Sequence, residues 1–343
     1  MDNGFQPAWW LPGSHLQSIW GRLVRDRRAV SLRREIVETP DGDELILDHL
    51  EAPSSPVRFI LLHGLEGSSN SVYIQGMLRL ISRAGYQATA VNFRYCARTR
   101  GDLSQMIPNR RLRMYHSGET TDLDFVVRLL SNRHPEEQFI AFGGSLGGNI
   151  LLKWLGENPD QALLRAAATI SVPYDLGEGA RYMEDAIGKM YTQRFLRTLK
   201  PKVVEKTKQF PHETRSINLE RVLRSETFRE FDDAATAPIH GFRDADDYYE
   251  RSSSLRFLSR IQTPTLCVSS VDDPFLPPAA LAAARSVASP AVEFRVTGGG
   301  GHLGFIGGPL PWKPLYWCEK TVFGWLEDRV PRTSEQPDLR PEC

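Results

Sequence analysis

The chain has 343 residues, of which 41% are hydrophobic and 24% charged, and its 42 basic residues are balanced by 42 acidic ones. This composition is typical of a globular protein and excludes a collagen-like, low-complexity or largely disordered chain. Zero net charge provides no field that attracts nucleic acid or an anionic membrane, so a neutral substrate is favoured.

The start of the chain, residues 1–18, is acidic and then aromatic, and matches neither a signal peptide nor a transit peptide. No apolar run reaches the roughly 18 residues of a membrane span. The four cysteines lie far apart, without metal-ligand spacing, and are expected to be reduced: Cys96, Cys267, Cys318 and Cys343. We therefore expect a cytoplasmic protein without integral membrane association.

The first predicted elements are two strands, 33–39 and 44–50, in which apolar and polar residues alternate on either side of the turn at 40–43. This pattern predicts a β-hairpin. An apolar run at 57–62 then predicts a buried strand, which leads through a loop into a helix over 73–84.

The same order of strand and helix continues, with strands over 88–93, 138–142 and 166–172 and helices over 118–132 and 147–157. Such alternation predicts a mostly parallel sheet with helices on both faces. The alternation stops between residues 173 and 260, a mixed polar and aromatic segment with helical stretches such as 179–199. We interpret this segment as a helical cap inserted after the sixth strand, where it would roof a pocket.

Two further strands, 265–270 and 292–296, are predicted with a helix at 281–287 between them, and a last helix should follow Pro314. The expected organisation is a core of residues 1–172 and 261–331 that includes an N-terminal extension (1–32), a cap (173–260) and a tail (332–343). The fold class is α/β.

A G-x-S-x-G pattern, Gly143-Gly-Ser145-Leu-Gly147, lies between the predicted strand 138–142 and the helix 147–157. Alone the pattern is weak, but the strand-turn-helix context is the one that a nucleophile elbow requires. Ser145 is therefore the predicted nucleophile. The alternative interpretation is a glycine-rich connection with an incidental serine.

A serine hydroxyl needs a base that a third group orients, and with this elbow the chain order is Ser, Asp, His. His302 follows four consecutive glycines, which are costly unless the backbone takes unusual dihedrals or passes close to a neighbour, so His302 is the predicted base. Asp273 is favoured as the acid over the adjacent Asp272, which would be a turn carboxylate. Histidines elsewhere are expected to be structural: His15, His49, His134, His212 and His240.

Acyl transfer needs N–H donors for a developing oxyanion. The predicted donors are the backbone N–H of Leu146, after the nucleophile, and that of Leu65, in the loop 63–67. His63 is then a loop-shaping residue. The alternative for this loop is an ordinary turn between a strand and a helix.

Other motifs do not indicate a cofactor or a metal. The glycines at 299, 301 and 304 match a dinucleotide pattern in spacing, but prolines follow them instead of a helix. The arginine-rich segment 94–113 is interpreted as a solvated loop. Ser117 is expected to cap the following helix, with Glu119 and Asp122 in its first turn, which favours a structural role for His116 over contact with substrate.

Several longer motifs carry a family resemblance: Pro7-Ala-Trp-Trp-Leu, His15-Leu-Gln, His63-Gly-Leu-Glu-Gly-Ser-Ser-Asn, Tyr115-His-Ser-Gly-Glu-Thr, Ser145-Leu-Gly-Gly-Asn-Ile, Asp272-Asp-Pro-Phe and Gly300-Gly-His-Leu-Gly-Phe. Through them the chain resembles the YheT-like branch of the α/β-hydrolases, which includes bacterial proteins assigned as esterases, eukaryotic lipid hydrolases and yeast medium-chain ethyl ester synthases. The resemblance implies the α/β-hydrolase fold and a charge relay of Ser145, an aspartate of the 272/273 pair and His302. It also implies carboxylic esters with short to medium acyl chains.

The predicted function is that of a serine esterase acting on a small neutral or lipid-like ester through an acyl-enzyme on Ser145, without a cofactor or metal. Acyl transfer to an alcohol by the same residues is an alternative. A ligand-binding protein on a hydrolase scaffold is another. A peptidase and an epoxide hydrolase are further alternatives, although an epoxide hydrolase normally has an aspartate where Ser145 stands. The sequence leaves the oligomeric state and the physiological substrate open.

Overall fold

The structure is a computed structural model that describes residues 4–25 and 29–330; the predicted tail (332–343) and Cys343 lie outside these ranges. The described strands of the central sheet are β1 (Arg33–Glu38), β2 (Glu44–Leu50), β3 (Val57–Leu62), β4 (Gln87–Asn92), β5 (Gln138–Gly144), β6 (Leu164–Ile170), β7 (Thr265–Ser270) and β8 (Val292–Thr297). Their order is β1-β2-β4-β3-β5-β6-β7-β8. The β1–β2 and β2–β4 pairs are antiparallel and the others parallel, which confirms the predicted hairpin and the mostly parallel sheet.

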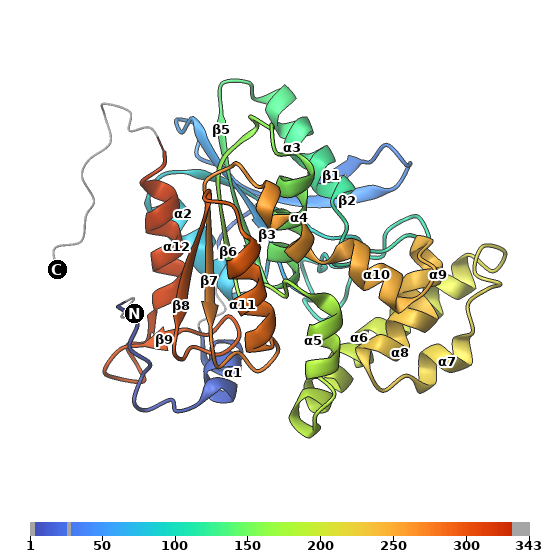
Figure 1. Cartoon of the computed structure of the whole chain (residues 1–343). Helices are drawn as coiled ribbons and strands as arrows, with labels where there is room; N and C mark the ends of the chain where they lie inside the picture. Colours follow the sequence, from blue (N-terminus) through green and yellow to red (C-terminus); the bar gives the residue numbers. More distant parts are fainter. Residues whose placement is uncertain (1–3, 26–28, 331–343) are drawn as a thin grey trace.

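Both faces of the sheet are covered by helices (Figure 1). The helices outside the cap are α1 (Ser14–Val24), α2 (Val72–Arg83), α3 (Thr121–Arg133), α4 (Leu146–Glu157), α11 (Pro278–Val287) and α12 (Trp317–Glu327). Alternate residues of β3 enter different cores: Phe59 packs with α2 and α12, and Ile60 with α3 and α4. All six residues of β3 are buried, which explains why its sequence is apolar except at Arg58, whose guanidinium is bonded to Glu137.

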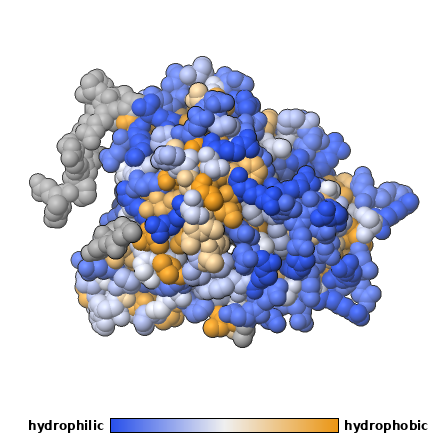
Figure 2. Space-filling model, viewed as in Figure 1, coloured by the Kyte–Doolittle hydropathy of each residue, from blue (hydrophilic) through white to orange (hydrophobic). Residues whose placement is uncertain are grey.

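The segment between β6 and β7 is helical and lies beside the sheet in Figure 1. Its helices are α5 (Leu176–Tyr182), α6 (Ala186–Gln209), α7 (Leu219–Arg224), α8 (Phe228–Phe231), α9 (Ala237–His240) and α10 (Ala245–Ser252). We call this segment the cap. A small core that includes Leu196, Val203 and Phe231 joins it to Tyr95 and Met114 of the sheet domain. On the side drawn in Figure 2 the outer surface of the cap is mostly hydrophilic.

Two predicted helices differ from the structure. The stretch 179–199 is not continuous, because the Asp185 side chain accepts the N–H of Gly188 at 2.5 Å and caps a new helix, α6, after α5 has ended. The expected cap at Ser117 is also wrong, since α3 begins only at Thr121. Ser117 instead donates its N–H to the Tyr248 hydroxyl of the cap. Neither difference changes the order of the elements.

The arginine-rich segment 94–113 is only partly the solvated loop that was predicted. Residues 100–105 are exposed, but Arg94 is 3% exposed. Its guanidinium lies 2.6 to 2.9 Å from carboxylate oxygens of Asp41, Asp43 and Asp122. A buried guanidinium requires such partners, and this one ties the β1–β2 turn and the start of α3 to the loop after β4.

No helix within the described ranges has both the length and the apolar character that crossing a membrane requires.

Replacing Arg94 by Met should destabilise the protein by about 3–5 kcal/mol, because it leaves buried carboxylates without their counter-charge. Arg100, in the exposed part of the same loop, is the matched control, and Arg100→Met should change stability by less than about 0.5 kcal/mol. Urea unfolding of both variants measures this difference. Equal unfolding midpoints would show that the Arg94 cluster does not stabilise the fold.

Candidate active site

Ser145 lies at the sharp turn between β5 and α4, where its backbone takes φ 54° and ψ −123°. A non-glycine residue in this region is strained by about 1–3 kcal/mol and persists only where its surroundings enforce it. A Cβ on Gly144 would lie 2.6 Å from the Tyr73 ring, and one on Gly147 would lie 2.4 Å from the His63 carbonyl oxygen. The glycines of the motif are therefore required by close packing around the turn.

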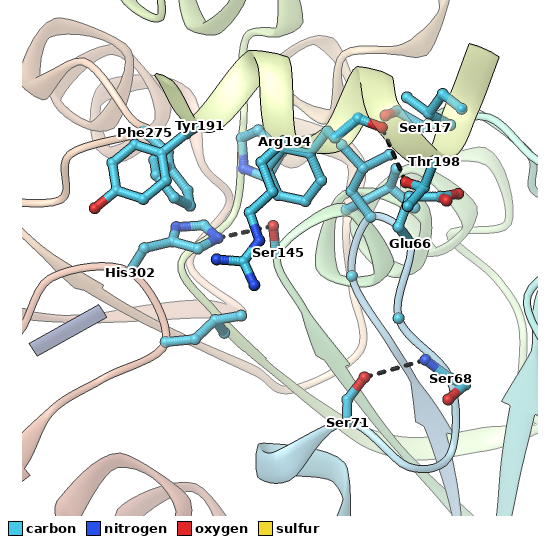
Figure 3. A pocket seen from close by; sticks show the side chains of 18 of the residues that line it. Glu66, Ser68, Ser71, Ser117, Ser145, Tyr191, Arg194, Thr198, Phe275 and His302 are labelled. Carbon is cyan, nitrogen blue, oxygen red and sulfur yellow. Dashed lines mark hydrogen bonds between the residues drawn. The ribbon is translucent and has the colours of Figure 1, made fainter. Parts of the chain in front are cut away.

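His302 lies within hydrogen-bonding distance of both predicted partners. Its Nε2 is 3.0 Å from Ser145 Oγ, an interaction drawn as a dashed line in Figure 3, and its Nδ1 is 2.9 Å from the nearer carboxylate oxygen of Asp273. Asp273 is 1% exposed, and the N–H of Phe275 donates to it at 2.9 Å. The fold thus brings together residues from the ends of β5, β7 and β8.

The structure distinguishes the roles of the adjacent Asp272 and Asp273, a choice in which the sequence only favoured Asp273. Asp272 Oδ1 accepts the N–H of Gly301 at 2.9 Å, so this carboxylate holds the glycine-rich loop that carries His302. Asp273 points to the imidazole instead. The two side chains diverge at the end of β7 and hold the backbone and the side chain of the same loop.

The N-terminal helix α1 supports the His302 loop, a contribution that the sequence analysis did not assign. A Cβ on Gly301, which has φ 62°, would lie 2.3 Å from the Ser14 carbonyl oxygen. Ser18 Oγ accepts the N–H of His302 at 2.8 Å. The run of glycines and the His15-Leu-Gln motif were the available signals, but neither indicates that the two segments touch.

The loop after β3 lies directly against the nucleophile, since a Cβ on Gly64 would be 3.1 Å from that of Ser145. In this loop Gly64 donates its N–H to the Tyr73 hydroxyl at 2.5 Å, and Glu66 donates its N–H to the Tyr115 hydroxyl at 2.8 Å.

Across the part of the chain that the structure describes, neither Leu65 N–H nor Leu146 N–H has a hydrogen-bond partner. The two amides expected to serve as donors are therefore left available beside Ser145.

His63 has the loop-shaping contacts that were expected of it. Its Nδ1 lies 2.8 Å from the Gly64 carbonyl oxygen, and its Nε2 accepts the N–H of Phe93 at 3.1 Å. Complete burial lowers the pKa of His63 to about 3, so the ring is neutral at ordinary pH.

A cavity of about 730 Å³ lies between the sheet domain and the cap and contains Ser145 and His302 in its wall. In Figure 3, Tyr191, Arg194 and Thr198 extend from α6 toward it. Several aromatic residues of the cap line it, among them Tyr191, Phe195, Tyr248 and Tyr249, whereas Tyr182 is 41% exposed and does not. A volume of this size accommodates an organic ligand of several hundred daltons.

His116 lies in the cavity wall, where its ring packs against the rings of His240 and Phe242 at 4.6 and 5.3 Å. Burial lowers the pKa of His116 to about 4 and holds the pKa of His240 well below its ordinary value. Both rings are therefore neutral near pH 7. A role for His116 in contacting substrate stays a hypothesis.

One group with the spacing of metal ligands is found among residues 4–25 and 29–330, namely His134, Glu136 and Glu137. Its members do not line the cavity, and Glu137 is already bonded to Arg58 and Gln87.

Comparison with known proteins identifies the family of the chain. The family model described as alpha/beta hydrolase fold matches residues 57–309. The chain is 36% identical over 325 residues to "Putative esterase YheT" of Escherichia coli, covering 94% of this chain and 92% of that protein. It is 31% identical to "Phospholipase ABHD3" of Mus musculus, covering 91% of this chain and 75% of that protein. It is also 31% identical to "Medium-chain fatty acid ethyl ester synthase/esterase 2" of Saccharomyces cerevisiae, covering 72% and 57%.

Solved structures share the fold at low sequence identity. The alpha/beta hydrolase GrgF of a Penicillium species superposes with a TM-score of 0.56 at 14% identity, covering 88% of this chain and 98% of that one. The esterase Pf2001 of Pyrococcus furiosus superposes with a TM-score of 0.54 at 15% identity, covering 87% and 92%.

The buried neutral histidines predict a loss of stability in acid. Below pH 6.5 the unfolded chain takes up a proton at His116 that the folded protein resists down to about pH 4, so the free energy of unfolding should fall as the pH is lowered between these values. One such group contributes up to about 1.4 kcal/mol per pH unit. Urea unfolding from pH 7 to 4 should give a shallower dependence for His116→Gln than for the wild type. The exposed His212 provides the control, and an unchanged dependence in His116→Gln would contradict the assignment.

Proposed function

Because the chain belongs to the α/β-hydrolase family, in the branch that contains YheT, we propose that it is a serine hydrolase that cleaves carboxylic esters through an acyl-enzyme on Ser145. The observation that carries the proposal is the continuous line of contacts from Ser145 Oγ through His302 to Asp273, with spacings of 3.0 and 2.9 Å, in the wall of the cavity. A hydroxyl in this arrangement is activated by a base whose tautomer a carboxylate fixes.

In the proposed first step, Ser145 Oγ attacks the ester carbonyl while His302 Nε2 accepts the hydroxyl proton. His302 then donates that proton to the departing alcohol, and Asp273 stabilises the imidazolium that forms between the two transfers. A water molecule, deprotonated by the same nitrogen, attacks the acyl-enzyme carbonyl, and His302 returns the proton to Ser145 Oγ as the ester bond breaks and the acid is released.

The tetrahedral intermediate places a negative charge on the former carbonyl oxygen. The N–H groups of Leu65 and Leu146 are the proposed donors to it, because both lie beside Ser145 and neither has another partner within the described residues. The position of Leu146 at the N-terminus of α4 adds the favourable end of a helix dipole.

The proposed substrates are neutral or lipid-like esters with short to medium acyl chains. The aromatic cap residues that line the cavity fit such a chain. The relatives named for phospholipid and for medium-chain fatty acid ethyl esters support a fatty acyl group as the part that is held.

Acyl transfer to an alcohol is the second candidate, because the yeast relative is named as both a synthase and an esterase. The two reactions share the acyl-enzyme and differ in whether water or an alcohol resolves it. Measuring ester formation against acid release at increasing ethanol concentration separates them.

A fluorophosphonate probe should add one adduct to the wild-type protein and none to Ser145→Ala, because only an activated serine reacts with it. Intact mass spectrometry measures the adduct, and circular dichroism of the variant controls for folding. A well-folded wild-type protein that neither takes up the probe nor hydrolyses a panel of esters of graded acyl length would favour a non-catalytic binding protein.

Asp273→Asn should lower kcat by about 10³- to 10⁴-fold, since it removes the carboxylate that orients the His302 ring. Asp272→Asn should cost about tenfold or less, because the amide oxygen can still accept the N–H of Gly301. Steady-state hydrolysis of one ester by both variants tests the assignment. A larger loss in Asp272→Asn would reverse the roles of the two aspartates.

A further inference from the structure

Glu66 directly follows the proposed oxyanion donor Leu65 and has a left-handed backbone, with φ 56°. L-residues other than Asn and Asp rarely adopt this conformation, so the loop must be held in it by its contacts. Glu66 donates its N–H to the Tyr115 hydroxyl, which in turn donates to Glu66 Oε1 at 2.9 Å. The side chain of Glu66 thus closes a ring of hydrogen bonds on its own backbone.

The charge that balances Glu66 comes from the cap. Lys202 on α6 places its Nζ 2.5 Å from Glu66 Oε1, and both side chains are buried, at 4% and 6% exposure. The ammonium also lies over the rings of Tyr95 and Tyr115, at 5.2 and 5.5 Å from their centroids. Since the Lys202 ammonium is the cation paired with Glu66 in the described structure, the conformation of the loop depends on where α6 lies.

We propose that Lys202 is a positioning residue for the oxyanion loop, so that the cap helps to assemble the catalytic site in addition to roofing it. The inference rests on the proposed function through Leu65. When α6 is seated, Lys202 holds Glu66, the left-handed turn is maintained and the Leu65 N–H faces the reacting carbonyl. When α6 is displaced, the carboxylate loses its buried partner and the turn relaxes. Substrates that seat the cap would therefore be turned over faster, in addition to being bound more tightly.

The chain supplies a matched control one helical turn away. Lys206, on the same helix, is 0% exposed, and its Nζ donates to the backbone carbonyls of Asn109 and Arg111 at 2.7 and 2.6 Å. It anchors the cap as Lys202 does, but it does not contact the loop 63–67 and does not line the cavity. If both buried lysines had a purely structural role, replacing Lys202 or Lys206 would affect kcat equally.

The experiment compares Lys202→Met with Lys206→Met in the full-length chain. We expect Lys202→Met to lower kcat by about 10- to 100-fold with KM changed by less than about threefold. The reason is that a Leu65 N–H misplaced by about 1 Å stabilises the transition state less strongly. Lys206→Met should keep kcat within about threefold of the wild type. Hydrogen exchange should accelerate over residues 63–71 in Lys202→Met and over 107–113 in Lys206→Met.

Equal losses of kcat in the two variants, or unchanged exchange over 63–71 in Lys202→Met, would overturn the inference while leaving the proposed function intact. A wild-type protein that neither hydrolyses esters nor takes up the fluorophosphonate probe would instead contradict the proposed function. If Lys202→Met does not fold because Glu66 is left charged and buried, the double variant Glu66→Gln/Lys202→Met removes both charges. It should show the same fall in kcat relative to Lys206→Met, and wild-type kcat in the folded double variant would overturn the inference.

Discussion

The turn at Ser145, with φ 54° and ψ −123°, can form only because backbone from a neighbouring strand passes closer to it than any side chain would allow. Gly147 leaves room for the carbonyl of His63, and Gly64 leaves room for Ser145 itself. Parallel strands end at one edge of a sheet, so the loops after β3, β5, β7 and β8 meet there. The close approach of these loops sets the positions of a hydroxyl, an imidazole and two N–H groups that have no partner within the described residues, before a substrate binds.

The irregular segments around this edge lack the regular backbone hydrogen bonds of a sheet or a continuous helix. Buried charged side chains hold these segments in place. Arg94 binds the β1–β2 turn and the start of α3 to the loop after β4, and Lys202 binds the cap to the loop after β3. A buried ion pair contributes little net stability, but losing one partner is costly, so these pairs permit one arrangement of the loops and disfavour others. The site is therefore positioned by specific polar contacts on top of a conventional apolar core.

The N-terminal helix α1 also helps to hold the loop that carries His302. Ser18 accepts the backbone N–H of His302, and Gly301 lies too close to Ser14 to carry a side chain. Asp272 holds this loop from the opposite side. The loop of the proposed general base is thus held by Ser18, 284 residues from His302, and by Asp272, 29 residues from Gly301, which makes the orientation of His302 a property of the whole domain.

Local patterns in the sequence were sufficient for the order and type of the elements of the sheet, because a period of two or of 3.6 residues reports which face each element buries. The glycines around Ser145 and before His302 likewise pointed to both residues, since such glycines mark backbone under unusual constraint. Other features depend on contacts between distant segments. Asp272 and Asp273 differ only in the direction in which they leave β7, and Ser117 bonds to Tyr248 of the cap instead of starting a helix. The burial of Arg94 and the reach of Lys202 to Glu66 were decided by the tertiary structure alone, because only the folded chain determines which charges are removed from water together.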